Sequence, residues 1–298
     1  MKKRSAYFVS LILAGCAASE QVYRKPEKPL LRVKINTLDE YSPEGSHVYF
    51  VDTELEPYFK TGLDLGDCCI REPENPEGFK KDVLKEARKL GYTEDQIKEM
   101  PVKEFVILAS GIVMSRFDYY GEYVKRSFEN FKFIPFFGSY FSDTARAIRG
   151  SAATRHLDSQ PIDRIFKEGE VVCRHYARVL TKVYEVIKSL NPSLANTSIS
   201  CFSTRDDHLW NQATTMSRLG NRDIQMDVAF IDPTFADSGE PLDALDEKHF
   251  GDLKRMAFEK YLQDFEQRLA KDYRIEIDKN SLEKVLEKSG KRKKKGRF

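Results

Sequence analysis

The chain has 298 residues, 41% of them hydrophobic, and a formal net charge of +2. It can therefore bury a sizeable core, and no stretch after its start approaches transmembrane length. The excess positive charge lies in Met1 to Arg4 and in Lys291 to Arg297, so the residues between them carry a net negative charge. A nucleic-acid-binding protein needs its basic surface on the fold itself, so we expect no nucleic-acid partner.

The N-terminus combines a basic start, a short apolar run at Ala6 to Ile12, and the small residues of Leu13-Ala14-Gly15-Cys16. This pattern resembles a bacterial lipoprotein signal peptide. The resemblance implies that residues 1–15 are removed and that Cys16 becomes the lipidated first residue. The alternatives are an ordinary secretory signal and a short apolar start of a cytosolic protein.

Several acyl chains on Cys16 would anchor the protein stably, whereas one chain alone is marginal. The resemblance implies a location in the cell envelope with a lipid anchor in a membrane. Because Ala17 and not Asp follows, this is the periplasmic side of the outer membrane if the organism is Gram-negative. Residues 16–30, which include Lys25-Pro26-Glu27-Lys28-Pro29, are expected to form a tether.

Residues 31–120 are predicted to form N-terminal strands and helices. Short apolar or alternating runs indicate strands of a small N-terminal element, and helical spacing continues after them. The predicted strands are 31–35 and 48–51, and the predicted helices are 77–90, 94–100 and 102–118. Residues 119–160 are then rich in Tyr and Phe, which favours core packing over the wall of a substrate groove by about two to one.

Three later motifs have the chemistry of a papain-type site. Cys173 opens an amphipathic segment that Asn191-Pro192 ends, and a thiol at a helix N-terminus is favoured as thiolate. The backbone NH groups there are suited to binding an oxyanion. His208 stands 35 residues later on a predicted strand, and Asp232 follows 24 residues after it, at the end of a second strand.

The turn at 219–222 makes the two strands antiparallel neighbours, with His208 and Asp232 near the same end. Asp232 would orient the imidazole that serves as the base for Cys173. Taken singly, each residue has a plainer interpretation: a small buried hydrophobe, a core histidine and a turn aspartate. The ordered combination favours a triad, with a degenerate or non-catalytic copy as the alternative.

These residues resemble the transglutaminase-like (papain-like cysteine) superfamily. Cys173 with Tyr176 and Ala177, His208 with Trp210 and Asn211, and Asp232 with Pro233 and Thr234 match its three motifs in order. The matched part spans about residues 160–236, and the Gly before the nucleophile stands four residues upstream instead of the usual two.

The resemblance implies an α+β fold with a transglutaminase-like core, in which the Cys-bearing helix packs on an antiparallel sheet with extra helices around it. We expect this catalytic domain at 121–275. A C-terminal helix, predicted at 280–288, and a basic tail would then occupy 276–298, and helical patterns at 246–271 would pack on the core.

The implied function is a cysteine peptidase, amidase or transglutaminase that acts on peptide or isopeptide bonds of the cell envelope through an acyl-thioester. Hydrolysis and transamidation stay open, as does the substrate beyond a protein or peptide. The alternatives are a non-catalytic binding or scaffold module and an acyltransferase to small amines.

We expect no cofactor and no metal, because Cys173 and His175 without further ligands form a poor zinc pattern, and His175 is interpreted as a surface or supporting residue. Cys201 is expected on a strand near the site. A disulfide from it to Cys68 or Cys69 stays open, as do free thiols.

Overall fold

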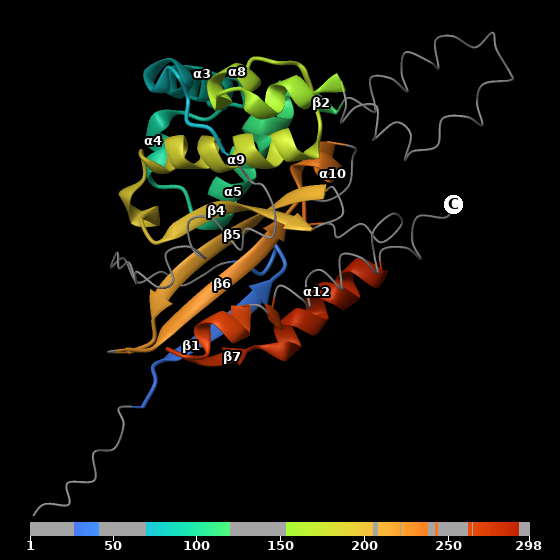
Figure 1. Ribbon diagram of the computed structural model, residues 1–298. Coiled ribbons are helices and arrows are strands. Elements are labelled where there is room, and N and C mark those ends of the chain that lie inside the picture. Colours follow the sequence, from blue (N-terminus) through green and yellow to red (C-terminus); the bar gives the residue numbers. More distant parts are fainter. Residues whose placement is uncertain are drawn as a thin grey trace, which may run out of the picture.

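The computed structural model describes residues 27–41, 70–119, 153–204, 208–220, 222–237, 242–243, 262–263 and 265–291 (Figure 1). The predicted signal peptide with Cys16, the strand at 48–51, Cys68 and Cys69, most of the aromatic segment and the basic tail lie outside these residues. None of the helices described has the length and hydrophobicity that crossing a membrane requires.

The described elements include both helices and strands, with α3, α4 and α5 in succession near the start and β4, β5 and β6 in succession later. The strands are β1 (Leu30–Asn36), β2 (Asp118–Tyr119), β3 (Glu170–Val171), β4 (Thr197–Thr204), β5 (His208–Arg218), β6 (Ile224–Ile231) and β7 (Arg274–Ile277). The α-helices are α3 (Pro76–Lys89), α4 (Glu94–Lys98), α5 (Val102–Arg116), α8 (Ile162–Ile165), α9 (Cys173–Lys188), α10 (Pro233–Asp237) and α12 (Lys279–Lys291), and η1 (Arg155–Ser159) and η2 (Pro192–Leu194) are 3-10 helices.

The main sheet has five strands in the order β4-β5-β6-β1-β7, and a second, two-stranded sheet joins β2 to β3. β4, β5 and β6 are antiparallel neighbours, as the predicted hairpin requires. β1, however, runs parallel to both β6 and β7. The fold is therefore α+β, as expected, but its sheet is mixed and not antiparallel throughout.

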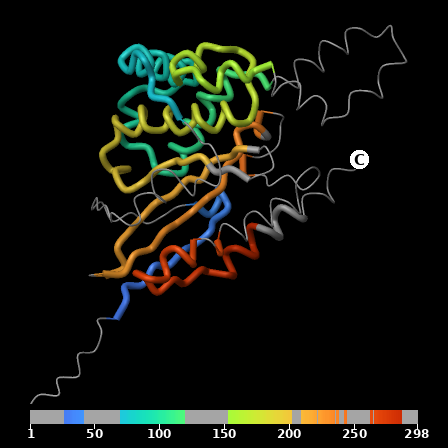
Figure 2. The backbone as a smooth tube through the Cα atoms, viewed as in Figure 1, coloured from blue at the N-terminus to red at the C-terminus, as the bar shows by residue number. Residues whose placement is uncertain are grey.

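β1 differs from the expected small N-terminal element because it lies inside the main sheet. Leu31 pairs with Ile224 of β6 and with Ile275 of β7. Figure 2 shows the same arrangement, with the blue N-terminal segment beside the orange and red C-terminal ones. Leu31, Val33 and Ile35 are buried on one face of β1, while Arg32 and Lys34 between them are half-buried. The main sheet therefore combines strands from the N-terminal, middle and C-terminal parts of the chain, which the sequence analysis treated as separate segments.

Helices cover both faces of the sheet (Figure 1). On one face, α9 packs over β4 and β5 and is itself covered by α3, α5 and α8. On the other face, α12 packs against β1. A hydrophobic cluster fills each interface; the α9 side includes Ala213 and Ile231, and the α12 side includes Trp210 and Phe230.

The helices near the site begin and end close to where the sequence predicted. α9 begins at Cys173, and the apolar stripe of the helix is buried. α3 ends before Gly91, whose φ of 91° lies in the left-handed region that glycine adopts without strain. Of the predicted 246–271 helical region, the described residues at 262–263 and 265–269 are helical.

Candidate active site

Cys173 is the first residue of α9 and is buried, with 7% of its surface exposed. The short strand β3 leads into it and pairs with β2, so that Tyr119 lies opposite Val171. Val172 is the N-cap residue, and its side chain carries no hydrogen-bond acceptor. The capping of this helix must therefore come from other side chains.

His208 begins β5 and pairs with Thr204 of β4. The pairing of Asn211 with Ile231 sets the start of β5 beside the end of β6, where Asp232 follows. The backbones of His208 and Asp232 thus lie at the same end of the sheet, as predicted. The side chain of His208 lies outside the described part of the structure.

Asp232 is buried, with 2% of its surface exposed, and it caps the short helix α10. Its Oδ1 accepts a hydrogen bond from the Thr234 N–H at 3.1 Å, and its own N–H donates to the Leu242 carbonyl at 2.8 Å. This capping role corresponds to the plainer interpretation of an Asp before Pro. The cap uses Oδ1 of the Asp232 carboxylate and thereby orients the side chain.

Tyr119, which pairs with Val171 just before Cys173, is half-buried. Burial raises the pKa of Tyr119, and the charges of Cys173 and Asp232 raise it further, while Arg174 opposes them. Both Cys173 and Asp232 therefore lie within electrostatic range of this one phenol. The phenol is a hydrogen-bond donor at neutral pH, because its pKa is raised and it stays protonated.

Tyr176 connects α9 to α10 and so helps to position Asp232. Its hydroxyl donates to Asp237 Oδ2 at 2.7 Å, and its ring packs edge-on against Phe117 with centroids 5.4 Å apart. Burial and the bond to Asp237 raise the pKa of Tyr176, so it stays a donor. Because α10 follows Asp232 directly, this bond ties the end of β6 to the first turn of α9.

Asn211 connects β5 to the same helix. Its Nδ2 donates to the Ala177 carbonyl at 2.9 Å, one turn beyond Cys173. Leu209 and Cys201 pack against Ala177 as well, so Leu209 and Asn211 face α9. Trp210 faces the other way and packs on Phe230 with ring centroids 6.1 Å apart. Trp210 therefore supports the sheet from the α12 side, and Asn211 is bonded to the helix that begins at Cys173.

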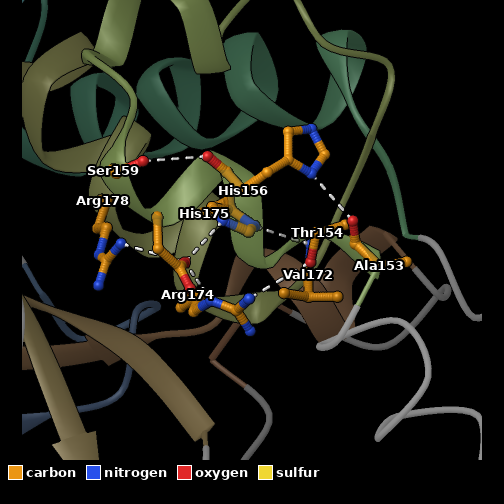
Figure 3. Close-up of polar contacts among 9 residues, drawn as sticks. Ala153, Thr154, His156, Ser159, Val172, Arg174, His175 and Arg178 are labelled. Carbon is orange, nitrogen blue, oxygen red and sulfur yellow. Dashed lines mark hydrogen bonds and ion pairs between the residues drawn. The ribbon is translucent and has the colours of Figure 1, made fainter.

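His175 was interpreted as a surface or supporting residue, and the structure shows that it is buried, with no exposed surface. Its Nδ1 accepts the N–H of Val172 at 3.3 Å, and its Nε2 lies 3.1 Å from Asp158 Oδ1 (Figure 3). This is the neutral tautomer with the proton on Nε2. Both ring nitrogens are occupied, so His175 does not serve as the base for Cys173.

Asp158 of η1 forms ion pairs with two arginines in the first turns of α9. Its Oδ1 accepts from Arg174 Nε at 2.5 Å and from Arg178 Nη1 at 3.5 Å, besides the His175 bond. The side chains of Arg174 and Arg178 are 16% and 8% exposed, so this charge cluster is largely removed from water. A buried cluster of this kind holds only when its charges are paired.

Sequence reasoning missed Asp158 and the two roles of His175. The available signal is weak: His175 stands three residues after the N-cap, where a capping box carries Glu or Gln. Asp158 lies on a separate segment, 15 residues before Cys173, and no motif marks it. Among the described residues, no group of three or more His, Cys, Asp or Glu is arranged to hold a metal ion.

Comparison of the chain with protein-family models, with curated proteins and with solved structures finds no match.

Proposed function

We propose that Cys173, His208 and Asp232 form a cysteine acyl-transfer site that acts on amide bonds of proteins or peptides in the cell envelope. The observation that supports this most strongly is the meeting of three elements at one end of the sheet. Cys173 opens α9 there, β5 begins there at His208, and β6 ends there before Asp232. Cys173 and Asp232 also influence the same phenol, that of Tyr119.

In the proposed reaction, His208 takes the thiol proton and the Cys173 sulfur attacks the carbonyl carbon of the amide. Collapse of the tetrahedral intermediate breaks the C–N bond, and His208 returns the proton to the leaving amine. The acyl-thioester is then cleaved by water, which gives hydrolysis, or by an amine, which gives transamidation. Backbone NH groups of the first turn of α9 and the Tyr119 hydroxyl would stabilise the oxyanion.

The proposal makes one geometric demand on β5. Leu209 and Asn211 face α9, and side chains alternate along a strand. An imidazole at position 208 must therefore turn around the end of the strand to reach the Cys173 sulfur.

The second candidate function is a non-catalytic module that binds a partner in the envelope. Two observations favour it: Cys173 is 7% exposed, and Asp232 already has a capping role on α10. Such a module predicts an inert thiol, which separates it from the acyl-transfer proposal.

Alkylation of the Cys173 thiol by iodoacetamide across pH tests the proposal, with Cys173→Ser identifying the labelled site. If His208 activates Cys173, alkylation should proceed well below the unperturbed thiol pKa of about 8.5, and His208→Ala should move the profile upward. His156→Ala is the matched control, because His156 is exposed and its ring bonds the Ala153 carbonyl. A wild-type profile at the unperturbed value that His208→Ala leaves unchanged would overturn the proposal.

Asp232 is tested by two substitutions. Asp232→Asn keeps an oxygen that can cap the Thr234 N–H, so the melting temperature should change little, while loss of the charge should lower turnover. Asp232→Ala should also lose the cap, at a cost of about 1 kcal/mol. Equal turnover for wild type and Asp232→Asn would remove Asp232 from the catalytic unit.

A further inference from the structure

The start of α9 lacks a side-chain cap of the usual kind. Val172 occupies the N-cap position, and valine has no oxygen to accept an N–H of the first turn. His175, three residues later, instead reaches back and accepts the N–H of Val172 with its Nδ1. This is the reverse half of a capping box, made by an imidazole instead of a carboxylate or an amide.

The other ring nitrogen of His175 ties this turn to a separate segment. Its Nε2–H donates to Asp158 on η1, and the same carboxylate oxygen accepts from Arg174. The backbone on one side of Cys173 and the guanidinium on the other are thereby fixed through Asp158. Arg174 also donates to Thr154 at 3.4 Å, which fixes the guanidinium more firmly (Figure 3).

We infer that His175 and Asp158 are positioning residues that hold Cys173 in its reactive orientation at the start of α9. His175 fixes the peptide that enters the helix, and Asp158 binds both this imidazole and the guanidinium of Arg174, the residue that follows Cys173. A nucleophile held in one orientation reacts faster than one that samples several. The inference rests on the proposed function, because it assigns these residues to a nucleophilic Cys173.

The groups that face His175 account for its neutral state. Arg174 and Arg178 flank it on α9, and Asp158 faces it from η1. Burial lowers the pKa of His175 most, and Arg174 lowers it further, while Asp158 opposes both. The imidazole therefore keeps an unprotonated Nδ1 at neutral pH, and the bond from Val172 requires that state.

The test compares His175→Gln with His175→Ala in the full chain. Glutamine carries one acceptor and one donor on its amide, so it can replace both bonds of the neutral imidazole, whereas alanine replaces neither. We expect His175→Ala to lower the rate of Cys173 alkylation at pH 7 by about tenfold or more and to shift its pH profile upward. His175→Gln should restore most of the rate.

Tyr184→Phe is the matched control for a loss of stability. It removes one buried hydrogen bond, to Thr197 Oγ1 at 2.6 Å, from the same helix but about three turns from Cys173. Tyr184→Phe should lower the melting temperature and leave the alkylation profile unchanged. If His175→Ala is insoluble, Asp158→Ala serves instead. It leaves the guanidinium groups of Arg174 and Arg178 without this carboxylate, so its melting temperature is measured first and the alkylation profile is compared in the folded protein.

The outcomes separate this inference from the proposed function. A perturbed wild-type profile that moves with His208→Ala but not with His175→Ala or Asp158→Ala would overturn this inference alone. Failure of His175→Gln to restore the rate in a folded protein would also overturn it. A wild-type thiol that is unperturbed and independent of His208 would remove the proposed function, and this inference with it.

Discussion

At the scale of single residues, the surroundings of the first turn of α9 change what each residue type does. His175 is an imidazole whose pKa is lowered to about 4, first by burial and then by Arg174. A histidine near a candidate nucleophile would usually be taken for a base. Here both of its nitrogens are bonded, so it acts on the backbone, and the base in the proposed reaction is His208.

The lowered pKa of His175 predicts a specific dependence of stability on pH. The unfolded chain binds a proton at this histidine below about pH 6.5, while the folded chain does not until about pH 4. The contribution of neutral His175 to the free energy of unfolding is therefore fully present above pH 6.5. It is lost as the pH falls from 6.5 to about 4, by at most about 1.4 kcal/mol per pH unit.

Urea unfolding at pH 4.5, 5.5 and 7 measures this loss directly. His175→Gln should flatten the dependence, because glutamine does not titrate, and His156→Ala should leave it unchanged. The same slope in wild type and His175→Gln would show that other groups cause it.

At the scale of elements, short polar contacts decide how α9 is held at both ends. Its first turn is held by Asp158 and by the link from Tyr176 to Asp237. Beyond its last turn, Asn191 is buried, and its Nδ2 donates to the carbonyls of Ile97 and Met100 at 3.0 and 3.1 Å. The helix α9 is thereby fixed at both ends against neighbouring helices.

Asn191→Ala should lower the free energy of unfolding by about 2–3 kcal/mol, because it removes two buried hydrogen bonds. Asn75→Ala is the comparison: Asn75 is an exposed cap that accepts the Gly78 N–H at 2.9 Å, and its loss should cost about 1 kcal/mol. Denaturant titration measures both values. Equal losses at the two positions would contradict the role given to Asn191.

At the scale of the whole molecule, the sheet joins distant parts of the chain. β1 lies between β6 and β7, so the strand nearest the start of the described chain pairs with strands from its last third. The site lies at one end of this sheet. We propose that the protein is held in the cell envelope by a lipid on Cys16, which would place this site close to envelope substrates.

Expression of the full chain in a bacterium tests the anchor. The mature protein should partition into detergent and begin at an acylated Cys16, because the apolar run at Ala6 to Ile12 precedes a small-residue cleavage pattern. Mass spectrometry of the N-terminal peptide identifies the modification, and Cys16→Ala is the control. A soluble, unmodified protein that still begins at Met1 would contradict the prediction.

The sequence by itself determined the elements that depend on neighbouring residues. The apolar spacing after Cys173 defined α9, Gly91 marked the end of α3, and the turn at 219–222 paired β5 with β6. Helical and hairpin structure follows from contacts within a few residues, so its pattern is visible locally. The order of Cys173, His208 and Asp232 could be read directly from the sequence, because a short motif surrounds each of them.

Only the tertiary structure decided the pairings between distant segments. β1 as an internal parallel strand, β7 beside it, and Asp158 bonded to His175 all join residues that no local pattern relates. An apolar run such as 31–35 fits a strand in any sheet, and its neighbours are chosen by the packing of the whole core. The face of β5 that meets α9 was likewise decided by packing, since Asn211 and not Trp210 contacts the nucleophile helix.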